Sequence, residues 1–302
     1  MTDRKEPHLF RNIRPVHLMT PLALYIAGAG LARYLGARMD YSAFGLGLSW
    51  LTCLFLGLFL LGDYFRMSFE SSVFPAGKSE SPDELLQGSE PSPRLLFSAL
   101  ALLTAGAVLT ILLGVSGKVT PGLGVVMAGL FLFPASLIIP GLKIKYSGMG
   151  EFITSISLVV FPPAFSFLLL YGEFHRFLYL CVFPLFPLHL ALVLTLRLRS
   201  YPTDYRLSRK TLMVRLGWVR GVFLHNLLIL SGFILFGAAM LFGFPARIVG
   251  PVFIVLFPAG YLIWIYAGLE RGAPVRWPVI IFLALVVFFL PLYLITFTMW
   301  VF

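Results

Sequence analysis

Residues 197–217 have the sequence RLRSYPTDYRLSRKTLMVRLG and form the most densely charged segment of this chain. Apolar runs at 176–196 and 219–242 flank the segment, and each is long enough to cross a bilayer. Such a segment can bind the membrane surface, or it can hold an anionic ligand through arginine forks and a metal-binding carboxylate. From charge alone, binding to the membrane surface is the favoured of these two interpretations. One acid lies here among six cations: Asp204 with Arg197, Arg199, Arg206, Arg209, Lys210 and Arg215.

The composition is typical of a membrane protein. The 302 residues are 59% hydrophobic and 12% charged, and the mean hydropathy is +0.92, whereas a soluble domain has about 25% charged residues. The net charge of +10 would suit a nucleic-acid partner, but the cations lie in loops between apolar runs and no soluble basic domain is visible. We therefore predict an all-α, polytopic membrane helical bundle without a nucleic-acid partner.

Nine apolar segments have the length of a membrane span. Prolines inside them, such as Pro162 and Pro163, are expected to kink helices, which membrane bundles tolerate because neighbouring helices satisfy the freed backbone groups. Most connections are short apart from a polar inner loop at about 71–93, so we predict a single domain over residues 1–302. The segments lie at about 18–36, 43–63, 94–114, 122–141, 152–172, 176–196, 219–242, 248–268 and 277–301.

The lysines and arginines are distributed unevenly between the two sides of these spans. With the basic N-terminal segment 1–17 in the cytoplasm, eighteen of them lie on the cytoplasmic side and five on the other. This satisfies the positive-inside rule, and we predict a protein of the cytoplasmic (inner) membrane, surrounded by lipid, with a cytoplasmic N-terminus. Cys53 and Cys181 lie in apolar runs without a CxxC partner, which indicates buried hydrophobic side chains.

Three acids follow the cytoplasmic ends of apolar runs. Asp63 ends the second run, and Glu70 comes seven residues later, on the same face if the helix continues. Asp204 lies at the equivalent level after the sixth run. Such carboxylates, together with water and phosphate, suit Mg²⁺. Alternatively, Asp63 and Glu70 only balance Arg66, which lies three and four residues away from them.

Several segments resemble the UbiA-type intramembrane aromatic prenyltransferases. RSYPTDYRLSRKTLMVRLG at 199–217 resembles the second signature of that family, and GDYFRMSFE at 62–70 resembles the first, N-D-x-x-D-x-x-x-D. LKIKYSGMGEF at 142–152 and IRP at 13–15 are similar to the menaquinone-branch members, which attach a polyprenyl chain to 1,4-dihydroxy-2-naphthoate. The similarity extends over nearly the whole chain and includes the nine expected helices.

The resemblance implies prenyl transfer at a cavity near the inner leaflet. Magnesium ions held by Asp63, Glu70 and Asp204 would bind the diphosphate of a prenyl diphosphate donor, and Asp63 and Asp204 would be catalytic. An electron-rich aromatic acceptor would attack the allylic cation that ionisation leaves, and an apolar channel would shield that cation from water. Further cations would contact the diphosphate: Arg66, Lys143, Lys145, Arg209 and Lys210.

The chain departs from both signatures. In the first, Gly62 replaces the asparagine and Arg66 replaces the middle aspartate; in the second, Ser200 replaces the leading aspartate. Fewer carboxylates weaken the binding of a hard cation. Either one metal ion suffices with help from arginine, or the protein binds an isoprenoid or quinone lipid without transferring it. A transporter would need polar groups at the midplane of the membrane, and here the acids lie at one face.

Overall fold

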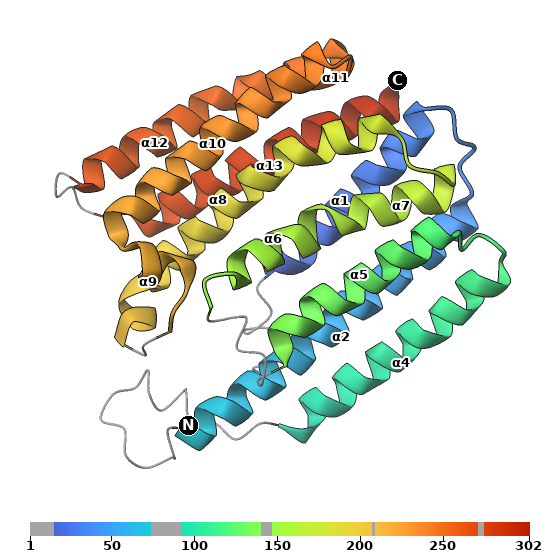
Figure 1. The fold of residues 1–302 in the computed structure, drawn as a ribbon, viewed down its shortest axis with the longest axis horizontal. Helices are drawn as coiled ribbons and strands as arrows, with labels where there is room; N and C mark the ends of the chain where they lie inside the picture. Colours follow the sequence, from blue (N-terminus) through green and yellow to red (C-terminus); the bar gives the residue numbers. More distant parts are fainter. Residues whose placement is uncertain (1–14, 74–91, 140–146, 207–208, 271–274) are drawn as a thin grey trace, which may run out of the picture.

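The computed structural model describes residues 15–73, 92–139, 147–206, 209–270 and 275–302. This part of the chain contains helices and no strand, which confirms the predicted all-α class. Figure 1 shows the long helices aligned across the molecule, with α10 and α12 at one edge and α4 at the other. The helices are α1 (Pro15–Tyr34), α2 (Tyr41–Val73), α4 (Pro93–Val115), α5 (Pro121–Ile138), α6 (Gly150–Val159), α7 (Phe161–Tyr171), α8 (Arg176–Arg206), α9 (Leu212–Leu216), α10 (Trp218–Leu241), α11 (Ala246–Val249), the 3₁₀ helix η3 (Gly250–Val255), α12 (Leu256–Glu270) and α13 (Trp277–Val301).

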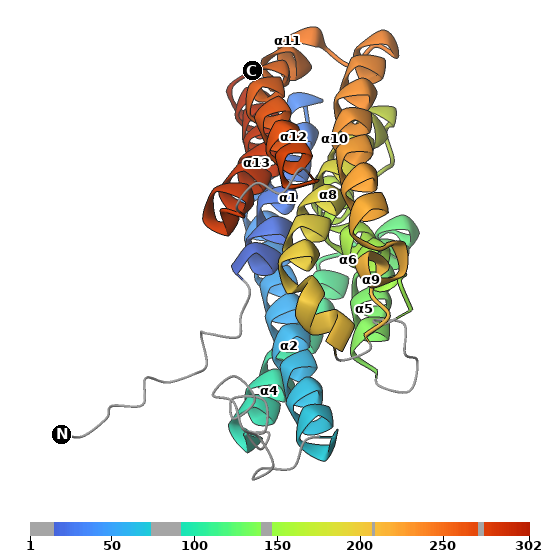
Figure 2. The same cartoon turned by 90° about the vertical axis from the view of Figure 1, so that its left-hand side faces the viewer.

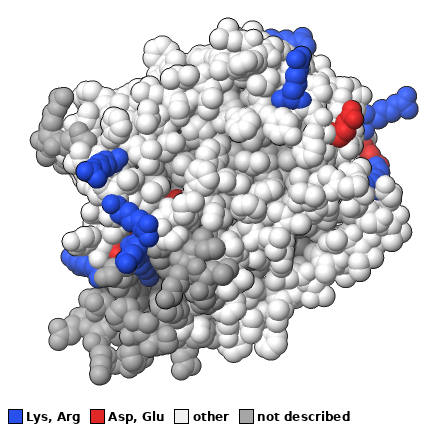
Figure 3. All heavy atoms as spheres, in the orientation of Figure 1, with Lys and Arg blue, Asp and Glu red and all other residues white. Residues whose placement is uncertain are grey.

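The chain is an integral membrane protein. Within the described residues, eight segments are long and apolar enough to span a membrane, and on the face in Figure 3 the charged side chains gather near two opposite ends. These eight match the second to ninth predicted spans. The first predicted span is also a helix, α1, but it is not among the eight. The eight segments are Tyr41–Phe65, Pro93–Val115, Pro121–Ile138, Gly150–Tyr171, Arg176–Pro202, Trp218–Leu241, Ala246–Leu269 and Trp277–Val301.

One of these spans is broken where the sequence places two prolines. Helix α6 ends at Val159 and α7 begins at Phe161. Pro162 and Pro163 have no N–H to donate to the preceding turn, and their rings collide with the carbonyls that an unbroken helix would place there. The expected kink is therefore a change of helix in the middle of the span.

Helix α1 lies inside the bundle, packed against α7 and α13. Its side chains Leu24, Tyr25 and Leu31 are buried. Gly28 allows the close approach to α7, because a Cβ atom at this position would lie 2.2 Å from the backbone oxygen of Pro163. Because glycine has no side chain, the backbones of the two helices come into contact here, as is common at helix interfaces in membranes.

Helix α8 is the most buried of the eight spans, and it contacts α10 over much of its length. A polar cluster links it to two other helices inside the membrane. The His225 ring Nε2 on α10 lies 3.0 Å from Thr195 Oγ1 on α8, and the Tyr266 hydroxyl on α12 donates to the same Thr195 oxygen at 3.2 Å. Away from water, such hydrogen bonds favour one arrangement of the three helices.

At the end of the bundle where α2 begins, Asp40 joins two segments. Its Oδ1 accepts a hydrogen bond from the Ala43 N–H at 3.0 Å, which caps the start of α2, and its Oδ2 pairs with Lys118 between α4 and α5. The hydrogen bond from Lys118, followed by the backbone bond, lowers the pKa of the Asp40 carboxyl below its ordinary value. Asp40 is therefore ionised throughout the physiological pH range.

Candidate functional site

The segment 197–217 is mostly helical, which corrects the predicted boundary of the sixth span. Helix α8 continues through Arg206, so Asp204 lies in its last turn. A second helix, α9, starts at Leu212, where the Thr211 side-chain oxygen accepts a hydrogen bond from the Val214 N–H at 3.4 Å. Both lie at one end of the bundle, close to the start of α6 (Figures 1 and 2). We call the last turns of α8, residues 209–211, helix α9 and the first turn of α6 the charged end.

A buried acid joins the three parts of the charged end. Glu151, in the first turn of α6, has a fully buried side chain, and its Oε1 lies 3.2 Å from Arg197 Nε on α8. Its Oε2 accepts a hydrogen bond from the Leu212 N–H at the start of α9, at 3.4 Å. Oε1 has no partner that meets hydrogen-bond geometry, so Arg197 interacts with this atom as an ion pair. A carboxylate at such a place is costly unless it is paired.

Asp204 is held between two arginines. The residue is 2% exposed, with Arg197 Nη1 at 3.8 Å from Oδ2 and Arg209 Nη1 at 3.5 Å from Oδ1. The Ser200 hydroxyl, one turn earlier on α8, donates to Oδ2 at 3.3 Å. The Arg209 N–H also donates to the Asp204 backbone oxygen at 2.9 Å, which turns the chain back after the helix. Both carboxylate oxygens therefore face cationic groups.

In the charged end, two carboxylates and two guanidinium groups are paired with each other, and further cations surround them at the surface. The carboxylates of Glu151 and Asp204 balance the guanidinium groups of Arg197 and Arg209, and we call these four residues the ion-pair cluster. The side chains of Arg197 and Arg209 are 20% and 27% exposed, so both arginines can reach a ligand from outside. Four further cations around the cluster are exposed or partly exposed: Arg199, Arg206, Lys210 and Arg215.

The first acidic segment lies on α2, as predicted for a continuing helix. Gly62 and Asp63 are half-buried, and the helix runs past Glu70 to Val73. The side chains of Arg66 and Glu70 lie outside the description, as do Lys143 and Lys145 entirely. The end of α2 points to the same end of the bundle as α9 in Figures 1 and 2. The meeting of Asp63 and Glu70 with Asp204 around one cavity stays a prediction.

The described side chains do not by themselves complete a metal centre. Within residues 15–73, 92–139, 147–206, 209–270 and 275–302, no group of three His, Cys, Asp or Glu could hold a metal ion. Asp204, one of the three predicted ligands, has a guanidinium beside each of its oxygens. A cation at those oxygens would displace or repel an arginine, so the neighbourhood of Asp204 has the chemistry of an anion site.

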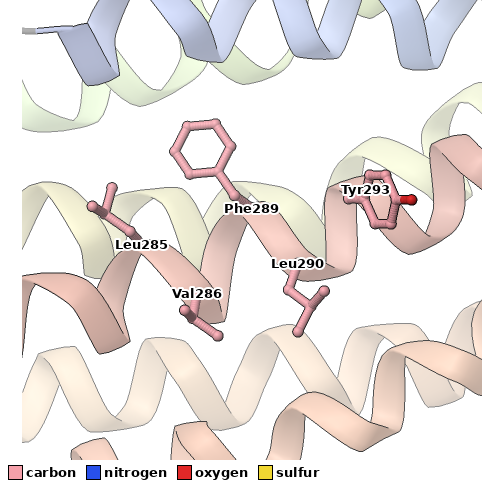
Figure 4. A pocket seen from close by; sticks show the side chains of 5 residues that line it. All are labelled: Leu285, Val286, Phe289, Leu290 and Tyr293. Atoms are coloured by element: carbon pink, nitrogen blue, oxygen red, sulfur yellow. The ribbon is translucent and has the colours of Figure 1, made fainter.

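A groove of about 340 Å³ lies elsewhere, on α13 (Figure 4). It is lined by apolar and aromatic side chains from the middle of that span: Leu285, Val286, Phe289, Leu290 and Tyr293. With no charged group in its lining, the groove does not suit a diphosphate.

Comparison with known proteins finds relatives by structure only. No family model matches the chain, and no curated protein does. A UbiA homolog from Archaeoglobus fulgidus bound to GPP and Mg²⁺ has a TM-score of 0.62 over 97% of this chain and 99% of its own, at 15% identity. A second structure of a UbiA homolog from Archaeoglobus fulgidus has a TM-score of 0.63 over 98% of this chain and 100% of its own, at 16% identity. With DMAPP and Mg²⁺ the TM-score is 0.61 over 96% and 98%, at 15% identity.

The chain has the fold of these UbiA homologs. The match extends over 97% of the chain. At this identity the match establishes the fold, and residue roles have to be argued from the chain's own side chains.

Two residues of the charged end were not among the predicted site residues. Glu151 was quoted only within the segment 142–152, and Arg197 only as one cation of the basic stretch. A signal for Glu151 was present, because it stands at the start of a long apolar run, and an acid entering a membrane helix needs a partner. No sequence pattern singled out Arg197 from its neighbours, since only the fold places it beside that acid.

Proposed function

We propose that the protein, as one domain over residues 1–302, transfers a prenyl group from a prenyl diphosphate to an aromatic acceptor within the membrane. The observation that carries this proposal is the match over 97% of the chain to a UbiA homolog bound to GPP and Mg²⁺. The charged end supports it, since arginines near 20–27% exposure beside a membrane bundle suit an anionic headgroup with an apolar tail.

In this proposal the carbon–oxygen bond of the donor breaks and the diphosphate leaves with the electron pair. Arg197, Arg209 and Lys210 stabilise the negative charge that develops on it. The acceptor ring forms the new carbon–carbon bond and then loses its proton. The apolar interior excludes water from the allylic cation. Following the resemblance of the segment 142–152 to the menaquinone branch, we propose a naphthoate-like acceptor.

Magnesium belongs to this proposal through helix α2. The fold relatives were solved with Mg²⁺, and the acids of α2, Asp63 and Glu70, are the ligands we propose for it. No step above depends on the ion, because the described residues form no metal site. Binding of Mn²⁺ to the purified protein, followed by electron paramagnetic resonance with and without Asp63→Asn, tests this assignment without any turnover.

The sidedness of the site follows from the distribution of cations. We propose that the charged end faces the cytoplasm and the inner leaflet of the cytoplasmic membrane, with the N-terminus on the same side. The donor would then enter with its diphosphate at the cytoplasmic surface and its apolar tail in the bilayer.

The second candidate is a relative that binds prenyl diphosphate or quinone without transfer. The ion pairs of Asp204 favour it, because they occupy a carboxylate that the resemblance assigns to a metal. Both candidates require the same site, and they differ only in turnover.

Radiolabelled geranyl diphosphate separates the two candidates. Membranes containing the protein are incubated with the label, with Mg²⁺ or EDTA, and with 1,4-dihydroxy-2-naphthoate or 4-hydroxybenzoate, and lipid-soluble product is counted. We expect product with the naphthoate, and a loss of at least about tenfold in Arg209→Gln, the scale of one charge-assisted contact. The matched control is Arg247→Gln, whose guanidinium bonds Tyr34 at the other end. Donor binding without product in any combination would establish the binding-only candidate.

A further inference from the structure

Asp204 occupies the position in which an anionic ligand would bind two arginines. Its oxygens lie 3.8 Å from Arg197 Nη1 and 3.5 Å from Arg209 Nη1, and the Ser200 hydroxyl donates to Oδ2. A phosphate group has the same need for oxygen atoms between guanidinium groups. The carboxylate of the chain therefore satisfies the cations that a diphosphate would use.

The position of Glu151 strengthens this arrangement. Its Oε1 lies 3.2 Å from Arg197 Nε, a different nitrogen from the one near Asp204, and its side chain is fully buried. Arg197 is thus held by its inner edge, while one terminal nitrogen, Nη1, is directed to Asp204. The guanidinium is already oriented before any ligand arrives, so binding would not have to order it.

We propose that Asp204 is an internal anion that holds the arginine clamp, Arg197 and Arg209, and that the diphosphate of the donor displaces it. This rests on the proposed function for the identity of the ligand and deepens it, because it assigns Asp204 as a competitor of the diphosphate instead of a metal ligand. The net charge of the ion-pair cluster is zero while Asp204 contacts the two arginines, and the remaining three residues have a net positive charge once Asp204 has moved away. A ligand must therefore replace both carboxylate oxygens, which favours a ligand with several negative oxygens.

The two assignments of Asp204 predict opposite results for Asp204→Asn. As a metal ligand, Asp204 would be needed for diphosphate binding, and its loss would weaken binding. As an internal anion, it opposes binding, and its loss strengthens the attraction between the clamp and a diphosphate. Coulomb energies at 3.5–3.8 Å in a partly exposed site are large enough for an effect of about tenfold or more.

The experiment measures the binding of inorganic pyrophosphate to the full-length, detergent-purified protein by isothermal titration calorimetry, in Mg²⁺, where the two assignments predict opposite results, and in EDTA. We expect Asp204→Asn to bind pyrophosphate at least about tenfold more tightly than wild type. The double variant Asp204→Asn/Arg209→Gln should lose that gain. The matched control is Asp40→Asn, which removes the same charge from another Asp–cation pair at the other end of the bundle, and it should bind as wild type does.

A second variant covers the case in which Asp204→Asn does not fold. Ser200→Ala removes the hydroxyl that holds Asp204 Oδ2 and leaves every charge in place, so Asp204 is displaced more easily and pyrophosphate affinity should rise in the same direction. Unchanged or weaker binding in both variants, or a gain that persists without Arg209, overturns the proposal. Absence of pyrophosphate binding in all forms overturns it as well.

The outcome is separable from that of the proposed function. Prenyl transfer by wild type together with weaker pyrophosphate binding in Asp204→Asn would overturn the internal anion and leave the transferase standing. Tighter binding in Asp204→Asn without transfer to any acceptor would leave the clamp standing and overturn the transferase.

Discussion

At the scale of single residues, Glu151 and Arg197 decide how the charged end is built. The acid is fully buried, and its ion pair with Arg197 and its bond from the Leu212 N–H connect α6, α8 and α9. Removing one member of such a pair leaves a buried charge without its partner, which costs more than removing both. The pair therefore has a consequence for stability that is independent of any ligand.

We expect Arg197→Gln to lower the free energy of unfolding by about 3 kcal/mol, near the lower end for breaking a buried pair because Arg197 is partly exposed. Glu151→Gln should cost less, because glutamine still accepts the Leu212 N–H. The double variant should cost less than the sum of the two. Thermal unfolding in detergent measures all three, with Arg176→Gln, an exposed arginine over the Phe177 ring, as the control. Additive losses would contradict the pairing.

At the scale of elements, the polar cluster of Thr195, His225 and Tyr266 fixes how α8 packs against α10 and α12. Helix α8 carries Arg197 and Asp204 near its end, so its rotation and depth in the bundle set the position of these two residues. Apolar contacts alone permit a membrane helix to slide against its neighbours, since lipid is as apolar as the partner. One hydroxyl shared by two other helices removes that freedom.

Thr195→Val keeps the shape of the side chain and removes the shared oxygen. We expect a loss of about 1–2 kcal/mol in stability, the range for leaving buried polar groups without a partner and for interhelical bonds in membranes. Thr296→Val is the matched control, because the Thr296 hydroxyl bonds only the Leu292 carbonyl in its own helix. Thermal unfolding of both variants measures the difference, and equal losses would show that the cluster does not join the helices.

At the scale of the whole molecule, the proposed orientation in the membrane depends on which side of the membrane each end of the bundle faces. The start of α2, with Asp40 and Lys118, belongs to one end, and the charged end belongs to the other. Eight spans of alternating direction keep each end on its own side. The sidedness proposed for the donor site thus depends on a property that can be measured directly.

We expect Tyr205→Cys to react with a membrane-impermeant maleimide only after intact cells are opened, because Tyr205 is 65% exposed at the charged end. Ser116→Cys, in the connection between α4 and α5, should react in intact cells. Both are made after replacing Cys53 and Cys181 by alanine. Labelling of Tyr205→Cys in intact cells would place the charged end outside and remove the basis for a cytoplasmic donor.

Eight of the nine predicted spans, their approximate limits and the membrane class could be read from the order of the amino acids alone. The reason is that a bilayer imposes length and hydropathy on each segment separately. A run such as 277–301 can therefore be recognised as a span without knowledge of its neighbours. The end of α8 could not be read in this way. Its last turns, up to Arg206, are polar, and they are contacted from outside the helix by Glu151, which pairs with Arg197, and by Arg209, which pairs with Asp204.

The partners of Asp204 also became visible only in three dimensions. From sequence it was one acid among six cations, and the resemblance made it a metal ligand; in the fold, Arg197 and Arg209 lie at its two oxygens. Charge along a chain does not specify which cation meets which anion, because that depends on how α6, α8 and α9 come together. The sequence determined that the bundle consists of membrane-spanning helices, because hydropathy acts within each segment. Tertiary structure decided which charges are paired, because ion pairs form between segments distant in the chain.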